Sequence, residues 1–154
     1  MIFVKTKIGV DKLVKKLKAN SVKASALHGG MRQNKRSKIM QDFRDERFRI
    51  LIATDIASRG LDVPHIEHII NYDMPQAPED FIHRIGRTAR AGSVGEAVSF
   101  LTQKDTRIWR SIERLLNKEE SKKKRRDPKN ENTTKFKHKK RSRSKNKKKV
   151  GGRN

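Results

Sequence analysis

RILIATD, residues 49–55, is a nearly unbroken apolar run that closes on a hydroxyl and a carboxylate. Strands of a parallel sheet have this composition because helices cover both of their faces. A second run of this kind, 66–72, follows Pro64. Elsewhere apolar side chains recur at helical spacing, as at Val10, Leu13, Val14 and Leu17. Alternating strands and helices favour an α/β domain with a mostly parallel sheet.

The same periodicities predict the remaining elements. We expect further strands at 2–4, 23–27 and 95–102, and helices at about 10–17, 32–44 and 78–87. Pro78 stands at a first helical position with acidic residues after it, which is typical of a helix start. A last amphipathic helix carries Ile108, Ile112, Leu115 and Leu116. The folded domain is therefore expected to span residues 1–118.

Charge divides the chain into two parts. It has 154 residues, with 40 Lys or Arg against 17 Asp or Glu, for a net charge of +23. Residues 119–154 hold 17 basic and 4 acidic side chains, a net +13, and almost no apolar ones. Such a segment cannot bury enough surface to offset its ordering entropy, so we predict a disordered basic tail. A helical continuation of the preceding helix is the alternative for its first few residues.

This composition narrows the partners and the compartment. Both parts would be drawn to a polyanion, and nucleic acid is the expected one because neutralised phosphates release counterions. An anionic membrane surface is the competing partner, but there is no lipidation motif or transmembrane run. The absence of cysteine excludes disulfides and cysteine-based zinc sites, and it suits a reducing compartment. We expect no membrane partner and a cytoplasmic location.

Several polar residues are candidates for chemistry, each with a plainer alternative. His83, Arg84, Arg87 and Arg90 follow one another near a helix end. Guanidinium groups suit a transferring phosphoryl group, although arginines at a helix carboxyl end also complement the macrodipole. Thr54 and Asp55 end a buried strand, where open α/β sheets hold ligands, but they could equally form a turn and helix cap.

A second group lies around a predicted helix start. Gln33 and Arg36 stand in the first turn or so, beside Gly29 and Gly30, where free amides and a guanidinium could hold a phosphate. A solvated basic face is the alternative. His65 and His68 have metal-ligand spacing, but there is no cysteine and no local acidic cluster, so we expect no metal site. Trp109 and Phe81 are expected in the core.

Four segments carry a family resemblance. In order, they are IFVKTK at 2–7, LHGGMRQNKR at 27–36, ATDIASRGLD at 53–62 and HRIGRTARAG at 83–92. Together they resemble the motifs of the second RecA-like domain of DEAD-box RNA helicases, over residues 1 to about 118. The resemblance implies a RecA-like three-layer fold. Among bacterial members, the RhlE type looks similar because it also has a Lys/Arg-rich tail.

The resemblance also implies roles for individual residues. Arg87 and Arg90 match arginine fingers that reach the γ-phosphate held by the other domain of the motor. Gly60 and Asp62 match positions at the nucleotide ribose. The positions that match RNA-backbone contacts are Gly29, Gln33, Arg36 and Thr54. Those that match the interdomain network are His83, Arg84 and Arg59.

Other family motifs are missing. The chain has no Gly-Lys pair, hence no P-loop, and no Asp-Glu-Ala-Asp sequence. ATP and Mg²⁺ are therefore expected only when an N-terminal RecA-like domain completes the motor, and neither is expected to be held by this chain alone. The family also has a strand and a helix before the segment matching 2–6, so we expect a domain truncated at its N-terminal edge, with part of the sheet uncovered.

Three functional hypotheses follow. The first is the C-terminal half of an ATP-dependent RNA helicase that works with a separately encoded N-terminal half. The second is a non-enzymatic RNA-binding or annealing module acting through the tail. The third is a remnant of a split helicase gene.

Overall fold

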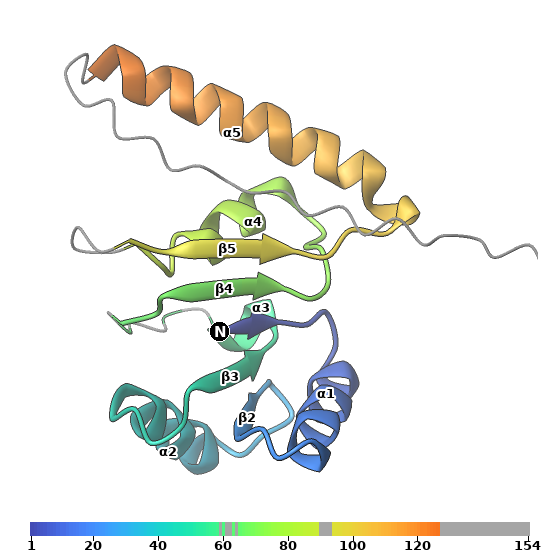
Figure 1. Cartoon of the computed structure of the whole chain (residues 1–154), viewed down its shortest axis with the longest axis vertical. Helices are drawn as coiled ribbons and strands as arrows, with labels where there is room; N and C mark the ends of the chain where they lie inside the picture. Colours follow the sequence, from blue (N-terminus) through green and yellow to red (C-terminus); the bar gives the residue numbers. More distant parts are fainter. Residues whose placement is uncertain (59, 61–62, 64, 90–93, 127–154) are drawn as a thin grey trace, which may run out of the picture.

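A five-stranded parallel sheet forms the centre of the protein (Figure 1). The computed structural model describes residues 1–58, 60, 63, 65–89 and 94–126, with side chains as far as 121. The strands are β1 (Ile2–Phe3), β2 (Ala24–Leu27), β3 (Ile50–Ala53), β4 (His68–Asn71) and β5 (Glu96–Ser99), in the spatial order β2-β3-β1-β4-β5. Every pairing is parallel, which confirms and sharpens the predicted mostly parallel sheet.

The ladder registers align the carboxyl ends of all five strands. Leu27 pairs with Ala53, Ala53 with Phe3, Phe3 with Asn71, and Asn71 with Ser99. These five residues form the last row of the sheet. The side chains that follow them in sequence therefore leave the sheet along one common edge, which we call the carboxyl edge.

Helices cover the two faces unequally. Helix α1 (Lys7–Ala19) packs on one face, whereas α2 (Gln33–Arg44), α3 (Asp55–Ser58) and α4 (Pro78–Ile85) belong to the other. Right-handed crossovers explain this distribution. The β1-to-β2 connection runs in one direction along the sheet, and the later connections run in the opposite direction, so α1 stands alone on its face.

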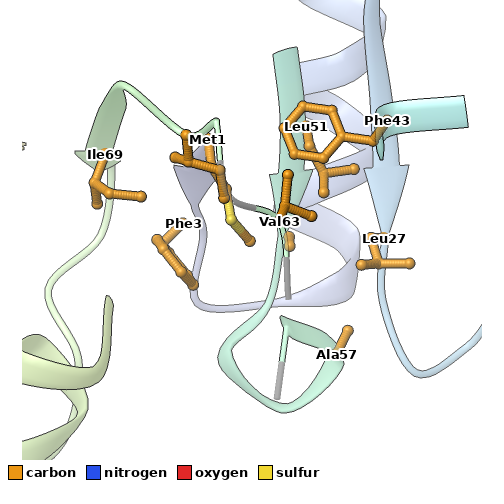
Figure 2. Packing of buried hydrophobic residues seen from close by; sticks show 10 residues of the cluster. Met1, Phe3, Leu27, Phe43, Leu51, Ala57, Val63 and Ile69 are labelled. Carbon is orange, nitrogen blue, oxygen red and sulfur yellow. The ribbon is translucent and has the colours of Figure 1, made fainter. Parts of the chain in front are cut away.

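Two apolar clusters sandwich the sheet. The first gathers Phe3, Leu27, Leu51 and Ile69 under Phe43 of α2 and Ala57 of α3 (Figure 2). The second joins Val10 and Val14 of α1 to Ile52 and Ala24. Fully burying side chains of this size is worth roughly 1.5–3 kcal/mol each. Helix α1 begins where Thr6 accepts a hydrogen bond from the Gly9 amide at 3.0 Å.

The last helix packs on α4 and is longer than predicted. Helix α5 (Thr106–Arg126) follows a short 3₁₀ turn, η1 (Gln103–Asp105), and buries Ile112 against Phe81 and Met74. Phe81 and Trp109 meet edge to face at 5.9 Å, so both lie in the packing as expected. The predicted boundary at 118 falls inside α5, which corrects the expectation of disorder for 119–126. Long straight-chain residues propagate a helix that packing has already nucleated. The rest of the predicted tail lies outside the described residues.

Part of the α1 face has no helix over it among the described elements. Tyr72, Val98 and Phe100 lie on this face beyond the reach of α1, and they are 46%, 40% and 48% exposed. The Tyr72 and Phe100 rings touch edge to face at 6.0 Å. We call these three residues the apolar half-face. In the described ranges, no helix has the length and apolar character needed to cross a membrane.

Candidate functional site

A buried arginine organises the carboxyl edge. Arg84 of α4 is 2% exposed. Its Nε donates to Asp55 Oδ1 at 2.6 Å, and its Nη2 donates to Asp55 Oδ2 at 2.7 Å. Its Nη1 donates to Asn71 Oδ1 at 3.0 Å and to the Asp73 carbonyl at 2.7 Å. Four of the five guanidinium N–H groups are thus satisfied inside this domain.

The network extends across the sheet. The guanidinium carbon of Arg84 lies 4.9 Å from the centre of the Phe3 ring, on the central strand. Asn71 is fully buried, and its Nδ2 donates to Ser99 Oγ on β5 at 3.0 Å. The Asp73 carboxylate accepts the Lys5 amide at 2.9 Å. Arg84 therefore connects the ends of β1, β3 and β4, and Asn71 extends this network to β5.

A small hollow opens beside this network. Its volume is about 50 Å³, and its lining residues are Phe3, Asp55, Ser58, Asp80, His83, Arg84 and Arg87. The structure therefore brings together three members of the predicted HRIGRTARAG site, His83, Arg84 and Arg87. His83 is exposed, with Nδ1 3.9 Å from Asp80 Oδ1. Arg87 lies just beyond the end of α4 and is half-buried.

The segment after α4 is anchored by a threonine and a glycine. Thr88 Oγ1 donates to the carbonyls of Ile66 and Glu67, the latter at 2.9 Å. A Cβ at Gly95 would overlap the Thr88 hydroxyl and lie 2.6 Å from the Ala89 amide, so only glycine fits there. These contacts hold the backbone that carries Arg87. Arg90, the second predicted finger, lies outside the described residues.

The predicted phosphate-contacting residues share the other half of the carboxyl edge. The Thr54 amide donates to the Leu27 carbonyl at 3.3 Å, so the ends of β2 and β3 lie side by side. Gly29 is exposed just beyond β2, and a Cβ there would meet no atom within 4 Å. Helix α2 then begins at Gln33, with no described side chain capping its amino end at Arg32.

Gln33 and Arg36 meet on the first turn of α2. Arg36 Nη1 donates to Gln33 Oε1 at 3.3 Å. Arg36 Nε is buried, and within the described part of the chain it has no hydrogen-bond partner. Most buried donors are satisfied, so an open one beside uncapped helix amides marks a place where an anion can bind.

Sequence reasoning missed His28 as an organiser of this edge. Its imidazole is nearly buried, receives the Gly30 amide at Nδ1 at 3.2 Å, and contacts Asp11 Oδ1 through Nε2 at 3.2 Å. The available signal was a histidine directly between a buried strand and two glycines. It gave no indication of the partner, because Asp11 lies 17 residues away on α1.

The remaining predicted site residues are only partly described. Gly60 has φ +74°, the left-handed conformation expected of a turn glycine. Arg59 and Asp62 lie outside the described residues. His65 contacts the Phe43 carbonyl, and His68 lies between two glutamates. No group of three potential metal ligands occurs among the residues that the structure describes.

Open parallel α/β sheets hold phosphorylated ligands at the carboxyl edge, where this domain has its arginine–carboxylate network and the basic start of α2. Its similarity to solved DEAD-box domains makes this fold RecA-like. Residues 1–92 match the family described as helicase conserved C-terminal domain. The chain belongs to this family, as a C-terminal domain of the DEAD-box kind. The narrower RhlE likeness stays a prediction.

Individual relatives agree with this assignment. The chain is 49% identical over 117 residues to the ATP-dependent RNA helicase DBP8 of Candida glabrata, covering 76% of this chain and 27% of that protein. It is similar to E. coli SrmB bound to regulator of ribonuclease activity A, with TM-score 0.69, 36% identity, and 74% and 67% of the two chains covered. It is also similar to S. cerevisiae Dbp5 bound to RNA and ADP BeF3, with TM-score 0.69, 39% identity, and 73% and 31% covered. The chain spans roughly a quarter of the length of the curated relatives it matches.

Proposed function

We propose that this domain serves as the second half of an ATP-dependent RNA helicase motor, in the cytoplasm. One half of its carboxyl edge holds the RNA backbone, and the other presents arginines to a nucleotide carried by an N-terminal RecA-like domain. The single observation that carries the proposal is that the described members of both residue groups lie along one edge of one sheet. A Dbp5 structure that contains both RNA and a nucleotide analogue supports it by similarity.

The RNA contact is assigned to Gly29, Gln33, Arg36 and Thr54. Uncapped amides of α2 and the open Nε of Arg36 suit a phosphate, which carries no base identity. Binding should therefore ignore sequence. It should also weaken steeply as salt rises, because the tail and this edge both act by releasing counterions.

The nucleotide contact is assigned to Arg87 and Arg90, with Gly60 and Asp62 at the ribose. The described residues fit one side of a nucleotide: Arg87 borders an open hollow, and Gly60 leaves space where a Cβ would stand. Bound ATP with Mg²⁺ supplies the phosphoryl group whose transfer is stabilised by positive charge. From this side the two guanidinium groups would stabilise the negative charge on that phosphoryl group. The Arg84 network holds α4 and its carboxyl end in place.

The RNA half of the proposal is tested by titrating single-stranded RNA into the full chain. Arg36→Ala should weaken binding several-fold and lower the slope of log K against log salt by about 0.7, the value for one lost phosphate contact on a single strand. Lys38→Ala is the matched control, because it removes the same charge from an exposed position of the same helix. Equal effects of both variants would contradict a specific role for Arg36.

The catalytic half is tested by RNA-stimulated ATP hydrolysis, with and without a first-domain polypeptide from a DEAD-box relative. Activity should require both polypeptides. Arg87→Ala should reduce it by about a thousandfold or more, and Arg87→Lys should not restore it, because lysine lacks the planar fork. Arg107→Ala, which removes an exposed charge from α5, should leave the rate unchanged.

The +13 tail favours a second candidate, an RNA-binding or annealing module that needs no ATP. An inactive mixture that still binds RNA would support that module, or a helicase remnant, over the motor. Removal of 127–154 distinguishes these two, because RNA annealing would be lost in the module and would never have been present in the remnant.

A further inference from the structure

A buried histidine lies between the sheet and the loop that enters α2. His28 follows the last residue of β2 and is 8% exposed. Its Nδ1 receives the Gly30 amide at 3.2 Å, and its Nε2 lies 3.2 Å from Asp11 Oδ1. Its own carbonyl accepts the Met31 amide at 3.2 Å. Side chain and backbone of one residue thus hold successive amides of the loop 29–31.

The hydrogen-bond pattern determines the tautomer. An amide N–H can only donate, so Nδ1 must offer a lone pair to Gly30. The ring proton then lies on Nε2, which donates to the Asp11 carboxylate on α1. The opposite tautomer, or a doubly protonated ring, would set two N–H groups against each other at Gly30. The loop conformation therefore requires the neutral, Nε2-protonated ring.

The His28 ring packs closely against the loop backbone at Gly30. A Cβ at Gly30 would lie 3.3 Å from His28 Nδ1 and 3.7 Å from Lys7 Cδ, so the loop backbone rests directly on the ring. Asp11 of α1 contacts the His28 ring, and Lys7 at the start of the same helix lies beside Gly30. Arg32 gives α2 no side-chain cap. The direction in which the first amides of α2 point therefore depends on the conformation of the loop 29–31 that precedes the helix.

We propose that His28 is a positioning residue for RNA binding. Its Nδ1 acceptor holds Gly30 so that the loop 29–31, the first amides of α2 and Arg36 face one RNA phosphate. Asp11 holds the tautomer through Nε2. This inference rests on the proposed RNA contact of the same edge. In it, His28 determines the conformation of the loop 29–31 without itself contacting RNA.

Two substitutions separate the two ring nitrogens. His28→Asn places an amide oxygen near the position of Nδ1 and keeps the acceptor for Gly30. His28→Gln places its amide near Nε2 and keeps only the link to Asp11. We expect the Asn variant to bind RNA within about twofold of the original chain and the Gln variant to bind about tenfold more weakly, since one lost hydrogen bond is worth about that factor.

The measurement is an amide NMR titration of the full chain with single-stranded oligouridylate, followed at Gly29, Gly30 and Gln33. The chemical-shift changes of these amides report the RNA affinity of the carboxyl edge separately from RNA binding by the tail. Gln41→Ala, a neutral change near the other end of α2, is the matched control and should change nothing. Asp11→Ala should weaken binding two- to threefold, and it keeps the proposal testable if a His28 variant does not fold. A nitrogen spectrum of the imidazole should show the proton on Nε2.

Three results would overturn the proposal: RNA affinity like that of the original chain in both variants, an equal loss of affinity in both, or a ring proton on Nδ1. Arg36→Ala separates a failure of the proposed RNA contact from a failure of the role of His28. If that variant also binds normally at these amides, the proposed RNA edge itself fails. If it binds weakly while His28→Gln binds normally, only the role of His28 fails.

Discussion

Arg84 of α4 and Asp55 at the start of α3 form a two-pronged ion pair, with nitrogen–oxygen distances of 2.6 and 2.7 Å. The family resemblance assigns Arg84 to a network between two domains, yet most of its donors are used inside this one. A buried guanidinium that also bonds Asn71 and the Asp73 carbonyl holds α4 against the ends of three strands. Arg84 is thus equipped to align Arg87, which stays a proposed nucleotide contact.

Breaking this pair should destabilise the domain. Arg84→Ala leaves Asp55 and Asn71 without their donor, and we expect a loss of about 3 kcal/mol in the free energy of unfolding. Arg84→Lys should still lose about 2 kcal/mol, because a point charge cannot reproduce the fork. Urea denaturation measures both, with Arg107→Ala as a surface control expected within about 0.5 kcal/mol. A loss below about 1 kcal/mol for Arg84→Ala would argue against the structural role.

Gly95 should tolerate no side chain. A methyl group there would overlap the Thr88 hydroxyl and the Ala89 amide, and overpacking of this kind costs about 1–3 kcal/mol. We expect Gly95→Ala to lower the thermal midpoint by several degrees, whereas Gly29→Ala, with open space around it, should shift it little. If the two variants melted at the same temperature, the close approach of 88–89 to 95 would be wrong.

In a chain that begins with a free Met1 amine, this group should make stability depend on pH. Burial lowers the pKa of this group from 8.0 to about 6, although its N–H donates to the His68 carbonyl at 2.6 Å. Above pH 8 the amine is neutral in both states. As pH falls from 8 to 6, the unfolded chain takes up the proton first, so the free energy of unfolding should drop by up to about 2.7 kcal/mol.

Urea titrations at pH 8.5 and pH 6 measure this difference for the chain beginning with a free Met1 amine. A matched chain with Gly-Ser placed before Met1 has an amide at that position, so it should lack this component of the pH dependence. Identical profiles for the two chains would show that the Met1 amine is solvated in the folded state.

The apolar half-face of Tyr72, Val98 and Phe100 should drive self-association. A net charge of +23 opposes contact between copies, and salt screens that repulsion. We therefore expect association to strengthen as salt rises, the opposite of RNA binding. Val98→Lys should restore the monomer in sedimentation experiments, whereas Ile56→Lys, a change on the exposed side of α3, should not. A chain that stays monomeric at high salt and high concentration would contradict this prediction.

Much of the fold was predictable because its signals are local. The run at 49–55 and its counterpart at 66–72 indicated parallel strands, and Pro78 indicated the start of α4, which begins at that residue. The register was not predictable, since it depends on pairing between strands far apart in sequence. Disorder for 119–126 was wrong, because composition alone cannot show that a packed helix extends into a polar segment.

For the candidate site, too, some features were predictable from the sequence and others required the tertiary structure. The sequence by itself determined the family, the order of the elements and the presence of phosphate-suited residues, because contiguous motifs and periodicity carry that information. Only the tertiary structure decided that Arg84 is buried against Asp55, that His28 holds Gly30, and that Tyr72, Val98 and Phe100 lack a cover among the described elements. The physical reason is that burial and pairing depend on which strand ends meet at one edge and on which face each crossover helix covers.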